Sequence, residues 1–203
     1  DCSHANLPGA DSNLTAPKTV VSIGIPDPND PLQKEYQKIL DDDDTAQAEV
    51  DKWIRENRAF DEKGGGVSTA ALNQRIKTRF EPIRKAYEEF LQRHPDHARA
   101  RLAYGSFLND THDEDGAEAQ WEKARQLDPK NPAAWNNLAN YYSEHGPIKK
   151  SFEYYTKAIE LNPAEPLYYH NFGNIVYLFR KDSMEIYKIT EQEVFTKALG
   201  LYT

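Results

Sequence analysis

The 203-residue sequence lacks most of the features that place a protein in a class at first sight. It contains one cysteine, Cys2, so no disulfide bond can form within the chain, and the redox compartment stays open. It has no run of 18 apolar residues, which excludes an ordinary membrane-spanning helix. It begins with Asp1 instead of methionine, which predicts either a removed targeting peptide or an excised piece of a longer chain. An exported and a cytoplasmic location both stay open.

Blocks of basic residues are also missing, and the charge that is present is spread unevenly. Lysine and arginine gather only in pairs such as Lys149-Lys150. Residues 1–63 carry 14 acidic and 7 basic groups, a net charge of −7, whereas residues 64–203 carry 19 and 18, a net charge of −1. Nucleic acids and anionic lipid surfaces attract proteins through clustered positive charge, so the sequence argues against both as partners.

No group of side chains in the sequence predicts catalysis, a cofactor or a metal site. Gly64–Gly66 lacks the lysine and hydroxyl residue of a phosphate-binding loop and is interpreted as a flexible linker. Asp41–Asp44 lacks the alternating ligands and turn glycine of a calcium loop, and is interpreted as the capping charge of a helix start. His94 and His97 are divided by Pro95 and have no second pair at zinc spacing, which favours structural roles. We therefore expect a non-catalytic protein without cofactor or metal.

Three prolines stand 34 residues apart and end segments with the same internal spacing: Pro95, Pro129 and Pro163. They define two gap-free units, 98–131 and 132–165. Large and small residues recur at matching places in the two units: Tyr104, Gly105, Leu108, Ala117, Trp121 and Ala124 in the first, and Leu138, Ala139, Tyr142, Ser151, Tyr155 and Ala158 in the second. Small residues let antiparallel helices approach closely, and aromatic residues fill the space between neighbouring pairs. The period predicts stacked helix-turn-helix units.

This pattern resembles the tetratricopeptide repeat (TPR) family, with Trp135 at the family's tryptophan position and Arg101 in its place one unit earlier. The resemblance implies an all-α fold, a TPR-type helix-turn-helix solenoid over residues 64–203 with one concave surface. The third unit, 166–203, is predicted to be partial and to contain about six extra residues, interpreted as an enlarged turn near 180–190. Because a solenoid normally ends in a polar cap, we expect a fragment of a longer TPR protein.

Three further segments are predicted upstream of the complete repeats. Residues 1–30, rich in proline, asparagine and serine, are expected to be an extended or disordered leader. Residues 31–63 are expected to be an acidic helical hairpin, because apolar stripes at helical spacing stand on both sides of the aspartate run. Residues 64–97 are expected to be a degenerate repeat that caps the solenoid, with one helix over 68–80 and another from Pro82.

The resemblance also implies where a ligand binds, because TPR proteins line their inner groove with fixed positions of each unit. Those positions predict a peptide-binding groove formed by Asn136, Asn137, Asn140, His170, Asn171, Asn174 and Tyr177. An amide donates and accepts hydrogen bonds together, so it suits the backbone of an extended peptide. Alternatively, Asn137 and Asn171 bond neighbouring helices. The carboxylate clamp of other family members is incomplete, since Leu102 and Leu167 stand at two of its basic positions.

These observations predict a non-catalytic scaffold that binds an extended segment of a protein partner. Neither nucleic acid nor a membrane span is expected. The alternative is a structural or self-assembly module within a larger repeat protein. In that case the open C-terminal edge, with Phe195, Leu199, Leu201 and Tyr202, would be buried by a neighbour.

Overall fold

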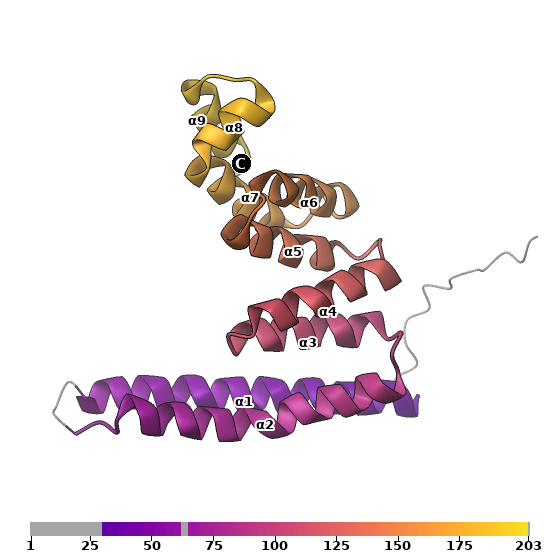
Figure 1. The fold of residues 1–203 in the computed structure, drawn as a ribbon, viewed down its shortest axis with the longest axis vertical. Coiled ribbons are helices and arrows are strands. Elements are labelled where there is room, and N and C mark those ends of the chain that lie inside the picture. Colours follow the sequence, from indigo (N-terminus) through magenta and orange to yellow (C-terminus); the bar gives the residue numbers. More distant parts are fainter. Residues whose placement is uncertain (1–29, 62–64, 203) are drawn as a thin grey trace, which may run out of the picture.

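The computed structural model describes residues 30–61 and 65–202, and every regular element in this part of the chain is a helix. The helices are, in chain order, α1 (Pro31–Asp61), α2 (Thr69–Arg93), α3 (Ala98–Asp110), α4 (Glu114–Leu127), α5 (Pro132–His145), α6 (Ile148–Leu161), α7 (Pro166–Leu178), α8 (Arg180–Tyr187) and α9 (Glu191–Gly200). The helix pairs follow one another in chain order, from α1 and α2 at one end to α8 and α9 at the other (Figure 1). Of the helices described, none is long and apolar enough to cross a membrane. The predicted leader lies outside the described residues, apart from Asp30.

Helix pairs recur at the predicted 34-residue period. The hairpins α3–α4 and α5–α6 have the most extensive internal contacts, and α4 then packs on α5 and α6 on α7. Gly105 allows the close approach within the first hairpin, because a Cβ atom there would lie 2.5 Å from Cδ1 of Trp121. The Trp121 ring is buried, and its Nε1 donates to the carbonyl oxygen of Leu102 at 3.2 Å. The predicted all-α, TPR-type solenoid is therefore confirmed.

One side chain at the same repeat position ties each unit to the end of the unit before it. It donates a hydrogen bond to the carbonyl oxygen of the proline six residues earlier. The pairs are Arg101 Nε with Pro95 (2.7 Å), Trp135 Nε1 with Pro129 (2.9 Å) and Tyr169 Oη with Pro163 (3.1 Å). Three different donor groups thus hold the same junction, and Arg101 keeps the bond although it replaces an aromatic ring.

The third unit differs from the other two because α7 packs against α9 and the extra residues form α8. The interpretation of 180–190 as an enlarged turn is wrong, since most of it is helical. Ser183 of α8 is fully buried, and its hydroxyl donates to the carbonyl oxygen of Val176 at 2.9 Å. Tyr187 stacks on Phe152 with ring centroids 5.9 Å apart. The insertion therefore folds back onto the preceding helices.

Two long helices at the N-terminal end correct the sequence-based interpretation. The predicted hairpin at 31–63 is wrong, because α1 continues for 31 residues through Asp41–Asp44. Asp43 is the only one of these four aspartates that is not exposed, and Tyr87 Oη donates to it at 2.8 Å. The predicted break before Pro82 is wrong too, because α2 passes through it. The segment expected to be a degenerate repeat is one helix paired with α1.

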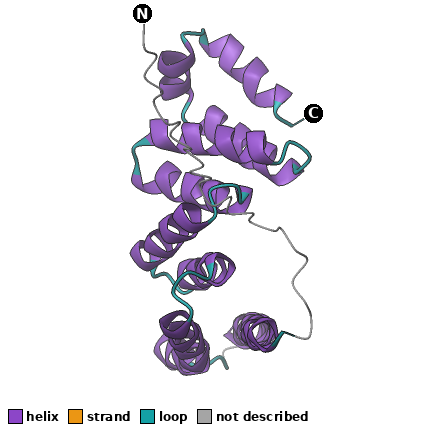
Figure 2. Ribbon diagram, turned by 90° about the vertical axis from the view of Figure 1, so that its right-hand side faces the viewer, coloured by secondary structure: helices purple, strands orange, loops and turns teal. Residues whose placement is uncertain are grey.

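The α1–α2 pair shares its core with the first repeats instead of forming a separate body. Tyr36, Ile39, Ala46 and Val50 of α1 belong to one buried cluster with residues of α2 to α5. In Figure 2, α1 and α2 are seen nearly end-on at the base, and the remaining helices rise above them. A second buried cluster joins α5, α6, α7 and α9. The concave side of this stack is where a ligand site was predicted.

Candidate binding groove

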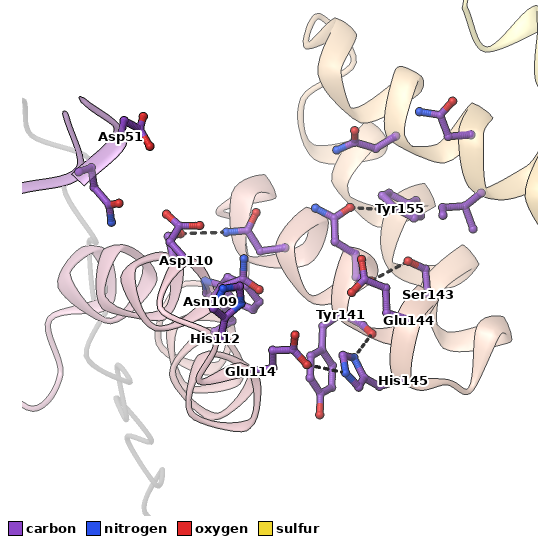
Figure 3. A pocket seen from close by; sticks show the side chains of 18 residues that line it. Asp51, Asn109, Asp110, His112, Glu114, Tyr141, Ser143, Glu144, His145 and Tyr155 are labelled. Atoms are coloured by element: carbon purple, nitrogen blue, oxygen red, sulfur yellow. Dashed lines mark hydrogen bonds and ion pairs between the residues drawn. The ribbon is translucent and has the colours of Figure 1, made fainter. Parts of the chain in front are cut away.

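A cavity of about 910 Å³ runs along the inner helices α3, α5 and α7 (Figure 3). Four of the seven predicted site residues line it: Asn137, Asn140, Asn171 and Asn174. Asn137 and Asn171 are 34 residues apart, as are Asn140 and Asn174, so they hold equivalent places on α5 and α7. Repeat geometry brings these amides together, because stacked units present equivalent positions on one face.

Part of this amide set links neighbouring units to one another. Asn171 Nδ2 donates to Asn136 Oδ1 at 3.2 Å, and Asn136 Nδ2 donates to Asn137 Oδ1 at 3.4 Å. Asn137 Nδ2 in turn lies 3.5 Å from the hydroxyl of Ser106. Asn136 is itself buried and does not line the cavity. A chain of hydrogen bonds thus joins α3, α5 and α7, as the helix-bonding alternative for Asn137 and Asn171 expects.

Asn140 and Asn174 are held differently, each by a tyrosine hydroxyl. Tyr155 Oη donates to Asn140 Oδ1, and Tyr202 Oη donates to Asn174 Oδ1 at 2.6 Å. The amide oxygens are thereby satisfied, while the two Nδ2 groups have no hydrogen-bond partner among the described residues. An oriented N–H donor at a concave surface suits the carbonyl groups of an extended peptide.

The remaining two predicted residues, His170 and Tyr177, lie outside the cavity. The His170 ring meets the Tyr202 ring near the C-terminal end of the chain, with centroids 5.4 Å apart. Tyr177 is exposed, and its ring centroid lies 5.8 Å from that of Phe195. Both partners lie in or just after α9, whose place the interrupted third repeat left unpredicted. A binding role for any of the seven residues stays a prediction.

Sequence reasoning missed the acidic part of the groove. Four carboxylate residues from four different helices line the same cavity: Asp51, Asp110, Glu114 and Glu144. No lysine or arginine belongs to its described lining. Because α1 is not part of a repeat, its contribution has no periodic signal. The excess of acidic groups in residues 1–63 was the only feature of the sequence that indicated an acidic site.

Two titratable groups of the groove, Asp110 and His145, have shifted pKa values. Burial raises the pKa of Asp110, against the opposing effect of its hydrogen bond with Asn109. Glu114 Oε2 lies 2.8 Å from Nε2 of His145. Figure 3 shows the two side chains facing each other. The hydrogen bond to the Tyr141 carbonyl oxygen, and then the nearby Glu114 carboxylate, raise the pKa of His145. His145 thus pairs with Glu114, whereas Asp51 and Glu144 have no ion-pair partner in the described structure.

Comparisons with known proteins add little to this description. No protein-family model and no curated protein matches the chain. Two similar solved structures bear the titles "Crystal structure of MamA" and "MamA RS-1 ArsTM double mutant". They are 16% and 18% identical to this chain, each with a TM-score of 0.49. The matches cover 85% and 82% of this chain and 94% of each of the other two.

Proposed function

We propose that the chain is a non-catalytic interaction scaffold that holds an extended peptide segment of a protein partner in its concave groove. The observation that carries the proposal is the pair of amides at Asn140 and Asn174. They repeat at the period of the solenoid, line one cavity and have their oxygens fixed by tyrosine hydroxyls. Their N–H groups are left for the main-chain carbonyls of a ligand.

The two serine hydroxyls along the groove support binding over catalysis. Ser106 Oγ donates to the carbonyl oxygen of Leu102 at 3.3 Å, and Ser143 Oγ donates to that of Asn140 at 2.6 Å. Both hydroxyls therefore bond their own helices, and within the described residues neither is paired with a histidine or carboxylate base as an activated nucleophile would be. Recognition through amides needs no such activation.

Replacing Asn140 and Asn174 together by alanine tests the proposal. Peptides selected on an array with the full chain should bind the double variant roughly tenfold more weakly, since each lost hydrogen bond contributes about 0.5–1.5 kcal/mol. The matched control replaces two exposed amides on outer helices, Gln126→Ala with Gln192→Ala, and should bind as the natural chain does. Unchanged peptide affinity in a folded Asn140→Ala, Asn174→Ala chain would refute the groove assignment.

The exposed apolar edge at the C-terminal end favours self-assembly as a second candidate function. Leu199 and Leu178 are 66% and 64% exposed, and Phe195 and Tyr202 are also partly open. Leu201, predicted to belong to this edge, is instead partly buried in the second core cluster. If this edge joins copies of the chain, light scattering should show a concentration-dependent oligomer that Leu199→Glu abolishes. A strict monomer at high concentration would eliminate this candidate.

A further inference from the structure

The binding groove continues into a second groove of different chemistry. This second groove, of about 820 Å³, lies between α1, α2 and α3. Four residues line both spaces: Gln47, Asp51, Asp110 and His112. The two grooves therefore meet where the middle of α1 faces the end of α3. A ligand long enough to cross that junction would contact both.

The second groove has an apolar floor, and the charged residues Lys77, Glu81 and Arg84 also line it. The side chains that form the floor are Val50, Ile54, Leu72, Ile76, Phe80 and Phe107. Phe80 and Phe107 are buried and meet edge to face with ring centroids 5.6 Å apart, so the base of the groove is closely packed. Ile54 is 42% exposed at its margin. Such a site suits a single apolar side chain, which would cover Ile54 and leave water.

Negative charge lies between the apolar floor and the amides. Asp51 and Asp110 stand at the junction, and Glu144 lies farther along the first groove. None of these three carboxylates has an ion-pair partner among the described residues, and Glu114 is already paired with His145. A ligand that covers unpaired carboxylates removes them from water, which is costly unless the ligand supplies opposite charge.

We propose that the occupant is a cationic, extended segment of a partner protein with an apolar anchor residue. The anchor enters the α1–α2–α3 groove beside Ile54, lysine or arginine side chains lie over Asp51 and Glu144, and the backbone passes on to the amides. This inference rests on the proposed function and names the chemistry of its ligand.

Charge decides against two other occupants. Residues 1–29 of this chain contain three aspartates and a single lysine, so they would add like charge to the groove. A second copy of the chain carries a net charge of −8. Neither complements the acidic lining of the first groove, which lacks lysine and arginine. The second groove does include Lys77 and Arg84, and Arg84 is already paired with Asp113.

Three matched synthetic peptides labelled with fluorescein test the inference by fluorescence anisotropy with the full chain. The first is lysine-rich with one leucine near its end, the second has glutamate for each lysine, and the third has serine for the leucine. The first peptide should bind most tightly, and its affinity should fall as salt is added. The glutamate peptide should not bind, and the serine peptide should bind roughly tenfold more weakly than the first.

Charge variants distinguish binding in the groove from the nonspecific attraction of an acidic protein for cationic peptides. Asp51→Asn with Glu144→Gln should weaken binding of the lysine-leucine peptide about tenfold, as expected for the loss of two carboxylate contacts. Asp42→Asn with Glu153→Gln removes two exposed charges elsewhere and should have little effect. Asp42 precedes Asp51 by nine residues, or about two and a half helical turns, and so lies on the opposite side of α1. If the two double variants lose the same affinity for the lysine-leucine peptide, the inference is overturned.

The apolar anchor has its own matched pair of variants. Ile54→Ser should abolish the preference for leucine over serine in the peptide, because it removes the open side chain that the anchor covers. Leu178→Ser alters another exposed apolar residue, which lines neither groove, and should leave that preference intact. Retention of the leucine preference in a folded Ile54→Ser chain would contradict an anchor in the second groove.

The remaining outcomes distinguish this inference from the proposed function. Array peptides that bind through Asn140 and Asn174 without preferring positive charge would leave the proposed function standing and overturn the cationic occupant. If no peptide binds through these amides, both fail. A synthetic peptide of residues 1–29 that displaces the lysine-leucine peptide at lower concentration would show the chain's own segment to be the occupant. A dimer disrupted by the Asp51 and Glu144 changes would point to a second copy. Either result overturns the inference.

Discussion

Single side chains decide how closely two helices of a repeat approach, and Gly105→Ala tests this directly. The added Cβ would lie 2.5 Å from Cδ1 of Trp121. That ring is held by its bond to the Leu102 carbonyl oxygen and has little space to withdraw. Overpacking should cost roughly 1–3 kcal/mol, offset in part by the gain of about 1 kcal/mol of alanine over glycine in a helix, so we expect a net loss of up to about 2 kcal/mol in the free energy of unfolding. Urea denaturation measures the difference.

Gly200→Ala is the matched control for that prediction. A Cβ atom at Gly200, the last residue of α9, meets nothing within 4 Å. We expect unchanged or slightly increased stability, since only the conformational freedom of the unfolded chain is altered. If both glycine substitutions shift the urea midpoint alike, the packing of Trp121 on Gly105 does not limit the hairpin.

Asp43 provides a pH-dependent test at the same scale. Burial raises its pKa above the ordinary value of 3.8, against the opposing hydrogen bond from Tyr87. The folded chain therefore keeps this proton to higher pH than the unfolded chain does. The stabilisation is complete below the unfolded pKa and is lost as pH rises through the higher folded pKa. Asp43→Asn keeps an oxygen acceptor for Tyr87 and cannot ionise, so its melting temperature should fall less than that of the natural chain over this pH interval.

Thermal unfolding followed by circular dichroism at a series of pH values checks the Asp43 prediction. The exposed neighbour Asp42 serves as the control, and Asp42→Asn should follow the pH dependence of the natural chain. A steeper loss of stability with rising pH in Asp43→Asn would show that the buried carboxylate is better satisfied than its surroundings indicate.

Among the helices, those of the complete repeats were predictable because their signals are local. Small residues at fixed places mark the hairpin contacts, and Asp128-Pro129 and Asn162-Pro163 stand between units. Gly146 ends α5 with φ of 65°, a backbone conformation that glycine adopts without steric cost. The four amides of the groove were predictable for the same reason, since they occupy repeat positions.

The break predicted within α1 was wrong because a tertiary contact outweighs a local signal. The signal is the run of aspartates, which is typical of a helix start, and the contact is the hydrogen bond from Tyr87 to Asp43. Buried positions and the half-buried Asp43 follow one another at steps of three and four residues: Tyr36, Ile39, Asp43, Ala46 and Val50. Asp43 thus occupies a place in the inner stripe, where the Tyr87 hydroxyl satisfies it. The stripe passes unbroken through the aspartate run, and that continuity was the signal available in the sequence. The carboxylates of the groove remained hidden because they come together only when α1 packs beside the repeats.

A proline at the centre of α1 tests the continuity of this helix. Thr45 is exposed, so Thr45→Pro removes a helical hydrogen bond without filling the core. We expect a loss of about 3 kcal/mol in the free energy of unfolding. Thr45→Ala is the matched control and should be neutral or slightly stabilising. If Thr45→Pro is as stable as Thr45→Ala in chemical denaturation, the chain turns near this residue, as a two-helix hairpin would.

Across the whole molecule, the buried residues form two clusters that meet at α5. Leu138 and Tyr142 belong to the cluster shared with α1 to α4, whereas Ala139 belongs to the cluster shared with α6, α7 and α9. Each helix pair therefore contacts only its neighbours along the stack. In such an architecture stability is close to a sum of unit and interface contributions, so a defect at one end should stay there.

Val194→Ala tests whether the molecule behaves in this additive way. Val194 of α9 is fully buried in the second cluster, and losing its two methyl groups should cost about 2 kcal/mol, from about 0.8 kcal/mol for each carbon group plus the cavity left behind. Amide hydrogen exchange should then accelerate in α7 and α9, which pack on each other, and stay unchanged in α3. Leu199→Ala, at a 66% exposed position of the same helix, should alter neither. Equal acceleration in α3 and α9 would mean that the described helices unfold as one cooperative unit, in which the binding groove cannot loosen at one end alone.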